Sequence, residues 1–155
     1  KFDKSGRIIN VASAAHSRAK LDIDDLQMKK GYKGWTAYSN SKLMNILFTY
    51  ELHKRYQDTG ITFNCLHPGF VDTSFGDNNI GLGRNILSLG KKIIAINVEE
   101  GARTNIYLAS SNEVKNISGK YFYKSIPIKS SKVSYLPKYQ EVLWSYSEKV
   151  ISSLS

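Results

Sequence analysis

The sequence predicts an α/β fold in which helices cover a parallel β-sheet. Short apolar runs rich in β-branched residues alternate with longer segments of helical periodicity, in the order strand, helix, strand, helix, strand, helix. This alternation is typical of parallel strands joined by crossover helices. Glycine and proline mark the ends of several of these segments. With 155 residues and neither an internal repeat nor a linker, the chain can form one domain with a real core.

Composition narrows the classes of protein to consider. A hydrophobic fraction of 41% and a charged fraction of 23% are ordinary for a globular domain. The net charge of +9 permits affinity for nucleic acid or an anionic membrane, but the basic residues are scattered. We therefore expect a solvated surface, one anionic cofactor and no nucleic acid partner. The single cysteine, Cys65, allows no intramolecular disulfide and is expected to be a buried, unreactive thiol.

The first predicted strand is Arg7–Val11, an apolar run bounded by glycine, and Ser13 follows its carboxyl end. Residues 12–33 are polar and irregular, so they are expected to form a loop with room for one helical turn. Loops longer than about 12–15 residues are usually functional or disordered. Because this loop connects Ser13 to Tyr38, we expect it to be functional.

A long helix is expected to begin at Thr36 or a neighbouring residue and to end near Asp58, with Gly60 as its stop signal. Its apolar residues cover more than one narrow stripe, which indicates burial on two sides. One side would face the sheet. A partner subunit is one candidate for the other side, so a homodimer through this helix is possible.

The remaining elements follow the same alternation. A second strand is expected at residues 61–66, broken by His67, Pro68 and Gly69, and residues 70–96 are expected to form a loop and a mobile, partly helical segment. The other predicted elements are a helix at Val98–Ser110, a third strand at residues 119–123 and a last helix at residues 134–154.

Three of these elements are expected to meet at one edge of the sheet. Ser13 and the Pro68-Gly69 pair both follow strand ends, and Tyr38 begins the helix that joins the two strands. A right-handed crossover places that helix start beside the preceding strand end, where ligands bind in such sheets. Tyr38 and Lys42 lie four residues apart, on one helix face. An ammonium group beside a phenol favours the phenolate and suits the pair to proton transfer, although such a spacing alone is common on solvated helices.

The motifs Asn10-Val-Ala-Ser13, Tyr38-x-x-x-Lys42 and Pro68-Gly69-x-Val71-x-Thr73 resemble those of the short-chain dehydrogenase/reductases. Asn10-Val-Ala-Ser-Ala-Ala-His16 and the longer stretch from Tyr38 to Phe48 are similar to the retinol dehydrogenase-like and WW-domain-oxidoreductase-like members. Ala12 stands where that subgroup has a first serine, and the catalytic second serine is kept as Ser13.

The resemblance implies catalytic roles for Ser13, Tyr38 and Lys42. Tyr38 would be the general acid in reduction and the general base in oxidation, Lys42 would favour its phenolate and bind the nicotinamide ribose, and Ser13 would bond the substrate oxygen. The cofactor, NADP or NAD with NADP slightly favoured, would be held by Tyr38, Lys42, Pro68, Gly69, Val71 and Thr73. Residues 74–97 would form a lid over the substrate.

The Gly-rich phosphate loop of that family is absent from this sequence. The resemblance therefore implies that residues 1–155 are the C-terminal half of a Rossmann-type doubly wound parallel sheet, without the N-terminal cofactor-binding half. Such a fragment would leave one edge of a central strand bare and would be inactive alone.

The expected function is NAD(P)-dependent interconversion of an alcohol and a carbonyl on a small lipophilic substrate such as a retinoid, steroid or aldehyde. The alternative is a catalytically silent scaffold of the same fold that binds nucleotide or partners. The expected location is the cytoplasm or the cytosolic face of an intracellular membrane.

Three other side chains are weighed as candidates. The histidines show no metal-ligand spacing, so no metal site is predicted. His67 is expected to be structural, and His16 is expected at the surface rather than in the substrate cleft. Trp35 is expected to pack against the loop, with substrate contact as the lesser option.

Overall fold

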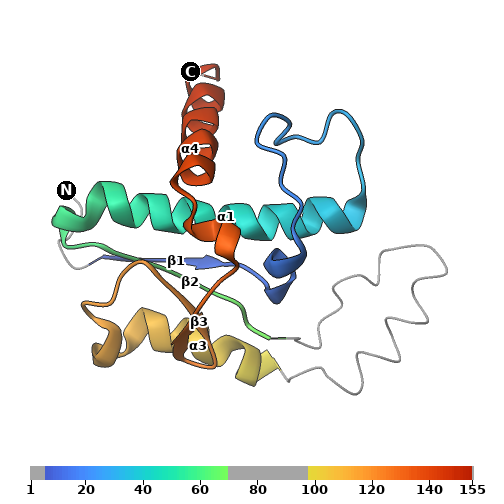
Figure 1. Ribbon diagram of the computed structural model, residues 1–155. Coiled ribbons are helices and arrows are strands. Elements are labelled where there is room, and N and C mark those ends of the chain that lie inside the picture. Colours follow the sequence, from blue (N-terminus) through green and yellow to red (C-terminus); the bar gives the residue numbers. More distant parts are fainter. Residues whose placement is uncertain (1–5, 70–97, 155) are drawn as a thin grey trace, which may run out of the picture.

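The computed structural model describes residues 6–69 and 98–154. Within them a four-stranded sheet has the order β1 (Arg7–Val11), β2 (Thr62–Leu66), β3 (Lys120–Tyr123) and β4 (Ile126–Ile128) (Figure 1). The strands β1, β2 and β3 are parallel, as predicted, and β4 runs antiparallel to β3.

Strand β4 was not predicted. It is joined to β3 by the two residues Lys124 and Ser125, which have φ values of 48° and 61°. A two-residue hairpin with positive φ at both central positions is of type I′, and its usual sequence indication is glycine or asparagine. Here lysine and serine occupy those positions, so the hairpin carries no such indication.

In the described part of the chain, α-helices cover both faces of the sheet. Helix α1 (Gly34–Tyr56) packs on one face and carries α4 (Pro137–Ser152) on its far side, while α3 (Val98–Ser110) packs on the opposite face (Figure 1). Short 3-10 turns occur at η1 (Ala14–Arg18), η2 (Gln57–Thr59), η3 (Asn112–Val114) and η4 (Lys132–Tyr135). The turn η1 is the single helical turn expected in the long loop.

The first residues of α1 and α4 differ from the predicted ones. Helix α1 begins at Gly34 without a side-chain cap, and it ends through η2 at Gly60, whose φ of 78° confirms the predicted stop. Helix α4 begins at Pro137 rather than Ser134. Proline fits the first helical position because its missing N–H has no intrahelical partner there, and it keeps the residue before it extended.

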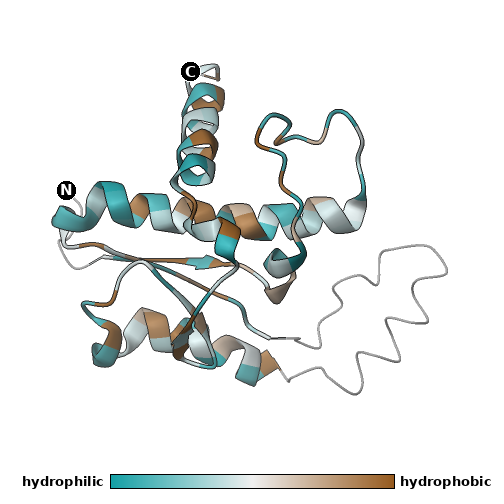
Figure 2. Ribbon diagram, in the orientation of Figure 1, coloured by the Kyte–Doolittle hydropathy of each residue, from teal (hydrophilic) through white to brown (hydrophobic). Residues whose placement is uncertain are grey.

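Both sides of α1 are buried, as its sequence predicts. Ile46 and Tyr50 pack on the sheet with Cys65, and Leu43 and Leu47 pack on the other side with residues of the long loop and α4. Figure 2 shows the hydrophobic residues spread along α1 and α3 on either side of the strands. Because α4 and the loop belong to the same chain, this two-sided burial needs no second subunit, and the homodimer stays a prediction.

Strand β1 lies at the edge of the described sheet and pairs only with β2. Its side chains Ile8 and Val11 are 41% and 43% exposed, as expected for a bare strand edge. The Nη1 of Arg7 donates to the backbone oxygens of Leu108 (2.9 Å) and Ser111 (2.8 Å) at the end of α3. A cation at a helix carboxyl end satisfies orphan carbonyls, so this arginine joins the edge strand to α3.

Two histidines follow the carboxyl ends of β1 and β2 and are buried, His16 and His67. The ring of His67 stacks on Tyr123 with centroids 4.2 Å apart and also stacks on Tyr121, which makes a T-shaped contact with His16. Burial, with a smaller contribution from the charge of His16, lowers the pKa of His67 to about 4, and burial likewise lowers the pKa of His16. Both rings are therefore neutral near pH 7.

The tight contact at Gly119 provides a test of the fold. Gly119 has a φ of 70°, and an added Cβ would collide with the ring of His53. We expect Gly119→Ala to lower the free energy of unfolding by roughly 2–4 kcal/mol, from left-handed strain and overpacking. Urea unfolding followed by circular dichroism measures the change. Gly31→Ala, at a site with open space around the residue, is the matched control; an equal loss in both variants would contradict this explanation.

Histidine burial predicts a loss of stability in acid. Between its unfolded pKa of 6.5 and its folded pKa of about 4, His67 takes up protons more readily in the unfolded chain. The free energy of unfolding therefore falls as the pH falls through this window, by about 1–2 kcal/mol between about pH 7 and about pH 5. Urea titrations at several pH values measure it. His67→Phe keeps a ring against Tyr123 and should flatten this slope; an unchanged slope would show that His67 is not its source.

Candidate functional site

Ser13 lies directly beyond the paired end of β1. The ladder continues one residue past the strand, since the Ala12 nitrogen donates to the Leu66 oxygen at 2.7 Å. The Ser13 side chain begins η1, where its Oγ accepts a hydrogen bond from the Ala15 nitrogen at 3.2 Å. A hydroxyl that accepts in this way can still donate its own proton. Ser13 is therefore held in place while remaining able to bond a substrate oxygen.

His16 fixes the backbone of Ser13, and the expectation of a surface histidine was wrong. Its Nδ1 lies 2.7 Å from the Ser13 oxygen, and its Nε2 accepts from the Ser131 nitrogen at 3.1 Å. Because a carbonyl only accepts and a backbone N–H only donates, the neutral Nδ1–H tautomer satisfies both bonds. His16 thus ties the loop after β1 to the segment just before η4.

Amide and hydroxyl side chains hold β1 against α1. The Nδ2 of Asn45 donates to the Val11 oxygen at 3.0 Å, and the Nδ2 of Asn10 donates to the Thr49 Oγ1 at 2.9 Å. Asn45 and Thr49 lie one turn apart on the same face of α1. These two bonds set the position of the helix along the strand that leads to Ser13.

A third asparagine holds the long loop on α1 near Tyr38. The Oδ1 of Asn40 accepts from the Lys20 nitrogen at 2.8 Å, and its Nδ2 donates to the Lys20 oxygen at 3.3 Å. Asn40 is buried, two residues beyond Tyr38. The backbone of the loop is thus bonded to the helix next to the predicted catalytic tyrosine.

Tyr38 has a neighbour on each side along the helix. The Lys42 Nζ lies 5.6 Å from the centroid of its ring, and the Trp35 ring centroid lies 5.7 Å away on the amino side. The three residues occupy positions i−3, i and i+4 of one helix face. Trp35 is 60% exposed, and its packing against the loop stays a prediction.

Pro68 and Gly69 turn sharply after β2. The Gly69 nitrogen donates to the Nδ1 of His67 at 3.2 Å, and Gly69 has a φ of 86°. A positive φ of this size favours glycine. The stacked ring of His67 therefore fixes the turn, in agreement with its predicted structural role. The predicted cofactor residues Val71 and Thr73, and the predicted lid at residues 74–97, lie outside the described residues.

The structure thus joins Ser13, the Tyr38–Lys42 pair and Pro68-Gly69 through adjoining elements. Strands β1 and β2 pair directly, and α1 packs on both of them.

The residues that sequence reasoning missed are polar groups inside this framework. Their one indication in the sequence was the recurrence of Asn40, Asn45 and Thr49 among the apolar residues of a buried helix.

The cysteine, the potential metal ligands and the helices were also considered as sources of further function. Burial raises the pKa of the Cys65 thiol to about 12, which confirms an unreactive cysteine. Among the described residues, potential metal ligands do not gather in groups of three or more. No helix in the described part of the chain combines the length and apolarity needed to cross a membrane.

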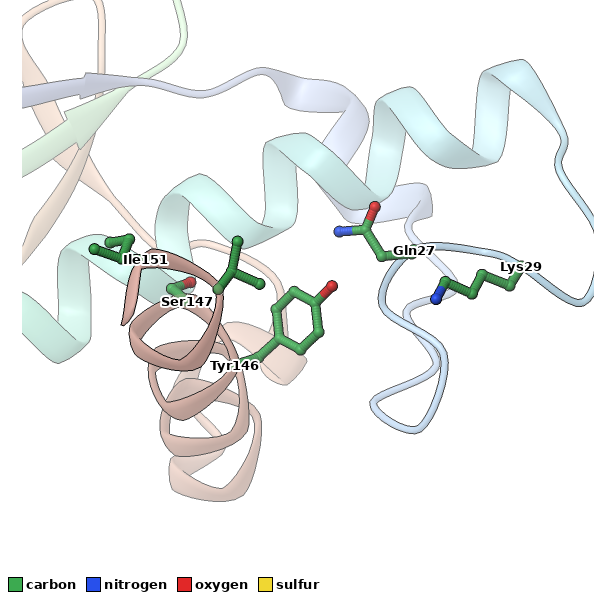
Figure 3. Close-up of a pocket in the computed structure, with 6 residues that line it drawn as sticks. Gln27, Lys29, Tyr146, Ser147 and Ile151 are labelled. Atoms are coloured by element: carbon green, nitrogen blue, oxygen red, sulfur yellow. The ribbon is translucent and has the colours of Figure 1, made fainter. Parts of the chain in front are cut away.

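A shallow groove lies elsewhere, between the long loop and α4 (Figure 3). Its volume is about 510 Å³, and none of the predicted site residues lines it. The residues around it are Gln27, Lys29, Tyr146, Ser147, Val150 and Ile151.

Comparison with known proteins adds independent information. The family model described as short chain dehydrogenase matches residues 2–80. Human retinol dehydrogenase 14 is 41% identical over 124 residues, covering 79% of this chain and 37% of the relative. Human polyprenol dehydrogenase is 37% identical and covers 92% of this chain and 44% of the relative. The WW domain-containing oxidoreductase of Drosophila melanogaster is 33% identical and covers 99% of this chain and 39% of the relative.

A solved structure agrees with the sequence relatives. An uncharacterised protein from Mycobacterium paratuberculosis superposes with a TM-score of 0.68 at 26% identity, covering 94% of this chain and 50% of that one. The three sequence relatives are longer proteins, and the chain spans less than half the length of each. The predicted Rossmann-type α/β class and the retinol dehydrogenase-like resemblance are confirmed. On these grounds the chain belongs to the short-chain dehydrogenase family.

Proposed function

We propose that the protein containing this chain is an NAD(P)-dependent oxidoreductase that interconverts an alcohol and a carbonyl on a lipophilic substrate. The observation that carries the proposal is the α1 face with Tyr38 and Lys42, bonded through Asn45 to the end of β1, just before Ser13. Family membership supports the reaction class. The names of the relatives, retinol dehydrogenase and polyprenol dehydrogenase, support a lipophilic alcohol.

The cofactor would supply or accept the hydride at the carbonyl carbon. In reduction, Tyr38 donates its phenolic proton to the carbonyl oxygen as the hydride adds to the carbon, and in oxidation it takes the hydroxyl proton back. Ser13 donates a hydrogen bond to the same oxygen and orients it. The Lys42 ammonium, 5.6 Å from the centroid of the Tyr38 ring, brings a positive charge close to the group that transfers the proton.

Two features of the described chain fit a nicotinamide cofactor. Lys42 brings an ammonium group that can donate to ribose hydroxyls, and the Pro68-Gly69 turn presents backbone held by the neutral ring of His67. The left-handed Gly69 has no side chain to obstruct a close approach to this backbone. The resemblance to this family slightly favours NADP over NAD, and on that basis we propose NADP.

Tyr38→Phe tests the proton transfer in the complete protein. Loss of the hydroxyl should lower kcat/KM for aldehyde reduction by a factor of about 100 or more, the usual contribution of a positioned acid or base. Oxidation of NADPH followed by absorbance measures it. Tyr56→Phe, the same change on the same helix at an exposed residue, should leave the rate near that of the wild type. Unchanged turnover in Tyr38→Phe would exclude this mechanism.

A measurement of cofactor binding distinguishes the proposed enzyme from a catalytically silent scaffold that binds no nucleotide. A ligand bound only by the native state raises its stability, by about 2.7 kcal/mol at a concentration 100 times its Kd. We expect saturating NADPH to raise the melting temperature of the complete protein by several degrees, and NADH to raise it less. Differential scanning fluorimetry measures both shifts. No shift with either nucleotide would contradict the proposed function.

A further inference from the structure

Trp35 is an exposed aromatic ring directly beside the predicted catalytic tyrosine. Its centroid lies 5.7 Å from that of Tyr38 with an interplanar angle of 32°, and its side chain is 60% exposed. Burying an indole side chain stabilises a fold by a large apolar contribution. Here most of that surface is left open, at the start of the helix face that carries the chemistry.

The position of the ring matters more than its exposure, because single exposed hydrophobic residues are common. Trp35, Tyr38 and Lys42 follow one another along one face of α1. A molecule whose carbonyl oxygen reaches the Tyr38 hydroxyl can therefore extend along the helix toward Trp35, in the direction away from Lys42. The indole offers that molecule a flat apolar surface.

We propose that Trp35 is a substrate-binding residue that selects carbonyl compounds and alcohols carrying a flat, unsaturated group next to the reacting carbon. The inference rests on the proposed function, since the site of reaction is Tyr38. A flat group stacks in offset or edge-to-face contact with the indole, whereas a puckered saturated ring of the same size cannot lie against it in this way. Trp35 binds the substrate body and takes no part in proton transfer.

A lipid bilayer is the competing ligand for this surface. Tyr32 is 75% exposed, and Lys29, Lys30 and Lys33 are exposed in the same segment, a combination that suits a membrane interface. The charge is partly compensated, however. Asp25 accepts hydrogen bonds from the backbone nitrogens of Lys29 and Lys30, and Lys30 lies 4.0 Å from Asp22. The contact with Tyr38 favours the substrate.

The chain allows a binding test that does not depend on turnover. It contains two tryptophans, and Trp144 contacts Phe48 and Arg55, which lie further along α1 than Tyr38. In the complete protein carrying Trp144→Phe, and Phe at any other tryptophan outside these 155 residues, Trp35 is the sole emitter when the excitation wavelength lies beyond the absorption of tyrosine. Benzyl alcohol added in the presence of NADPH, with which an alcohol cannot react, should change its emission with saturation, and cyclohexylmethanol should change it less. Emission unchanged by benzyl alcohol would overturn the proposal.

Kinetics test selectivity with matched aldehydes. Trp35→Ala should lower kcat/KM for benzaldehyde about three- to tenfold, the worth of one aromatic contact, and leave that for cyclohexanecarbaldehyde and propanal within about twofold. Trp35→Phe should restore most of the benzaldehyde rate. Equal losses for all three aldehydes would show that Trp35 only supports Tyr38, and no loss for benzaldehyde would show that it binds nothing; either result overturns the proposal.

The two hypotheses fail in different ways. If the wild-type protein oxidises NADPH with none of the aldehydes, the proposed function fails, and the fluorescence titration still decides whether Trp35 binds the flat alcohol. Vesicles of phosphatidylserine and phosphatidylcholine provide the last comparison. Emission that responds to vesicles and not to benzyl alcohol would assign the surface to a bilayer and overturn the inference.

Discussion

The packing of α1 on the end of β1 is the constraint on which the rest of the described structure depends. Asn45 and Thr49 bond the strand, while Ile46 and Tyr50 between and beyond them bury their side chains against the sheet. Polar and apolar contacts thus alternate along one helix face. Apolar burial supplies most of the attraction but is not directional, and the hydrogen bonds fix the position along the strand. A slip of one helical turn would break both bonds and move Tyr38 by about 5.4 Å.

Several features could be predicted from the residues because their causes are local. The strand Arg7–Val11, the stop at Gly60 and the helix Val98–Ser110 each follow from side-chain shape, glycine or charge within a few residues. The features that were not predicted either depend on residues far away in the sequence or lack the usual residue that indicates them. The hairpin at Lys124 and Ser125 lacks glycine. His16 is polar and follows a strand in a loop, yet it is buried, and its hydrogen bond to Ser131 comes from a segment 115 residues away.

The candidate site likewise contains residues that could be predicted from the sequence and residues that could not. Tyr38 and Lys42 could be recognised because both lie on one helix, where spacing alone defines a face. The supporting bonds of Asn10, Asn40 and His16 could not, because each joins segments at least 20 residues apart. The buried amides leave few alternatives for the packing of the loop, since an unpaired amide in this position would cost free energy. Sequence motifs thus indicate the reacting groups, and the structure adds the contacts that hold them.

The hydrogen bond between His16 and Ser131 has a consequence for the order of folding. It joins residues 115 apart in the sequence, and contacts of such separation form only after the entropy of closing the intervening chain has been overcome. The local turn at Ser13 can form early, whereas its final anchoring waits for the segment that leads into α4. The geometry around Ser13 is therefore complete only when the segment that leads into α4 is in place.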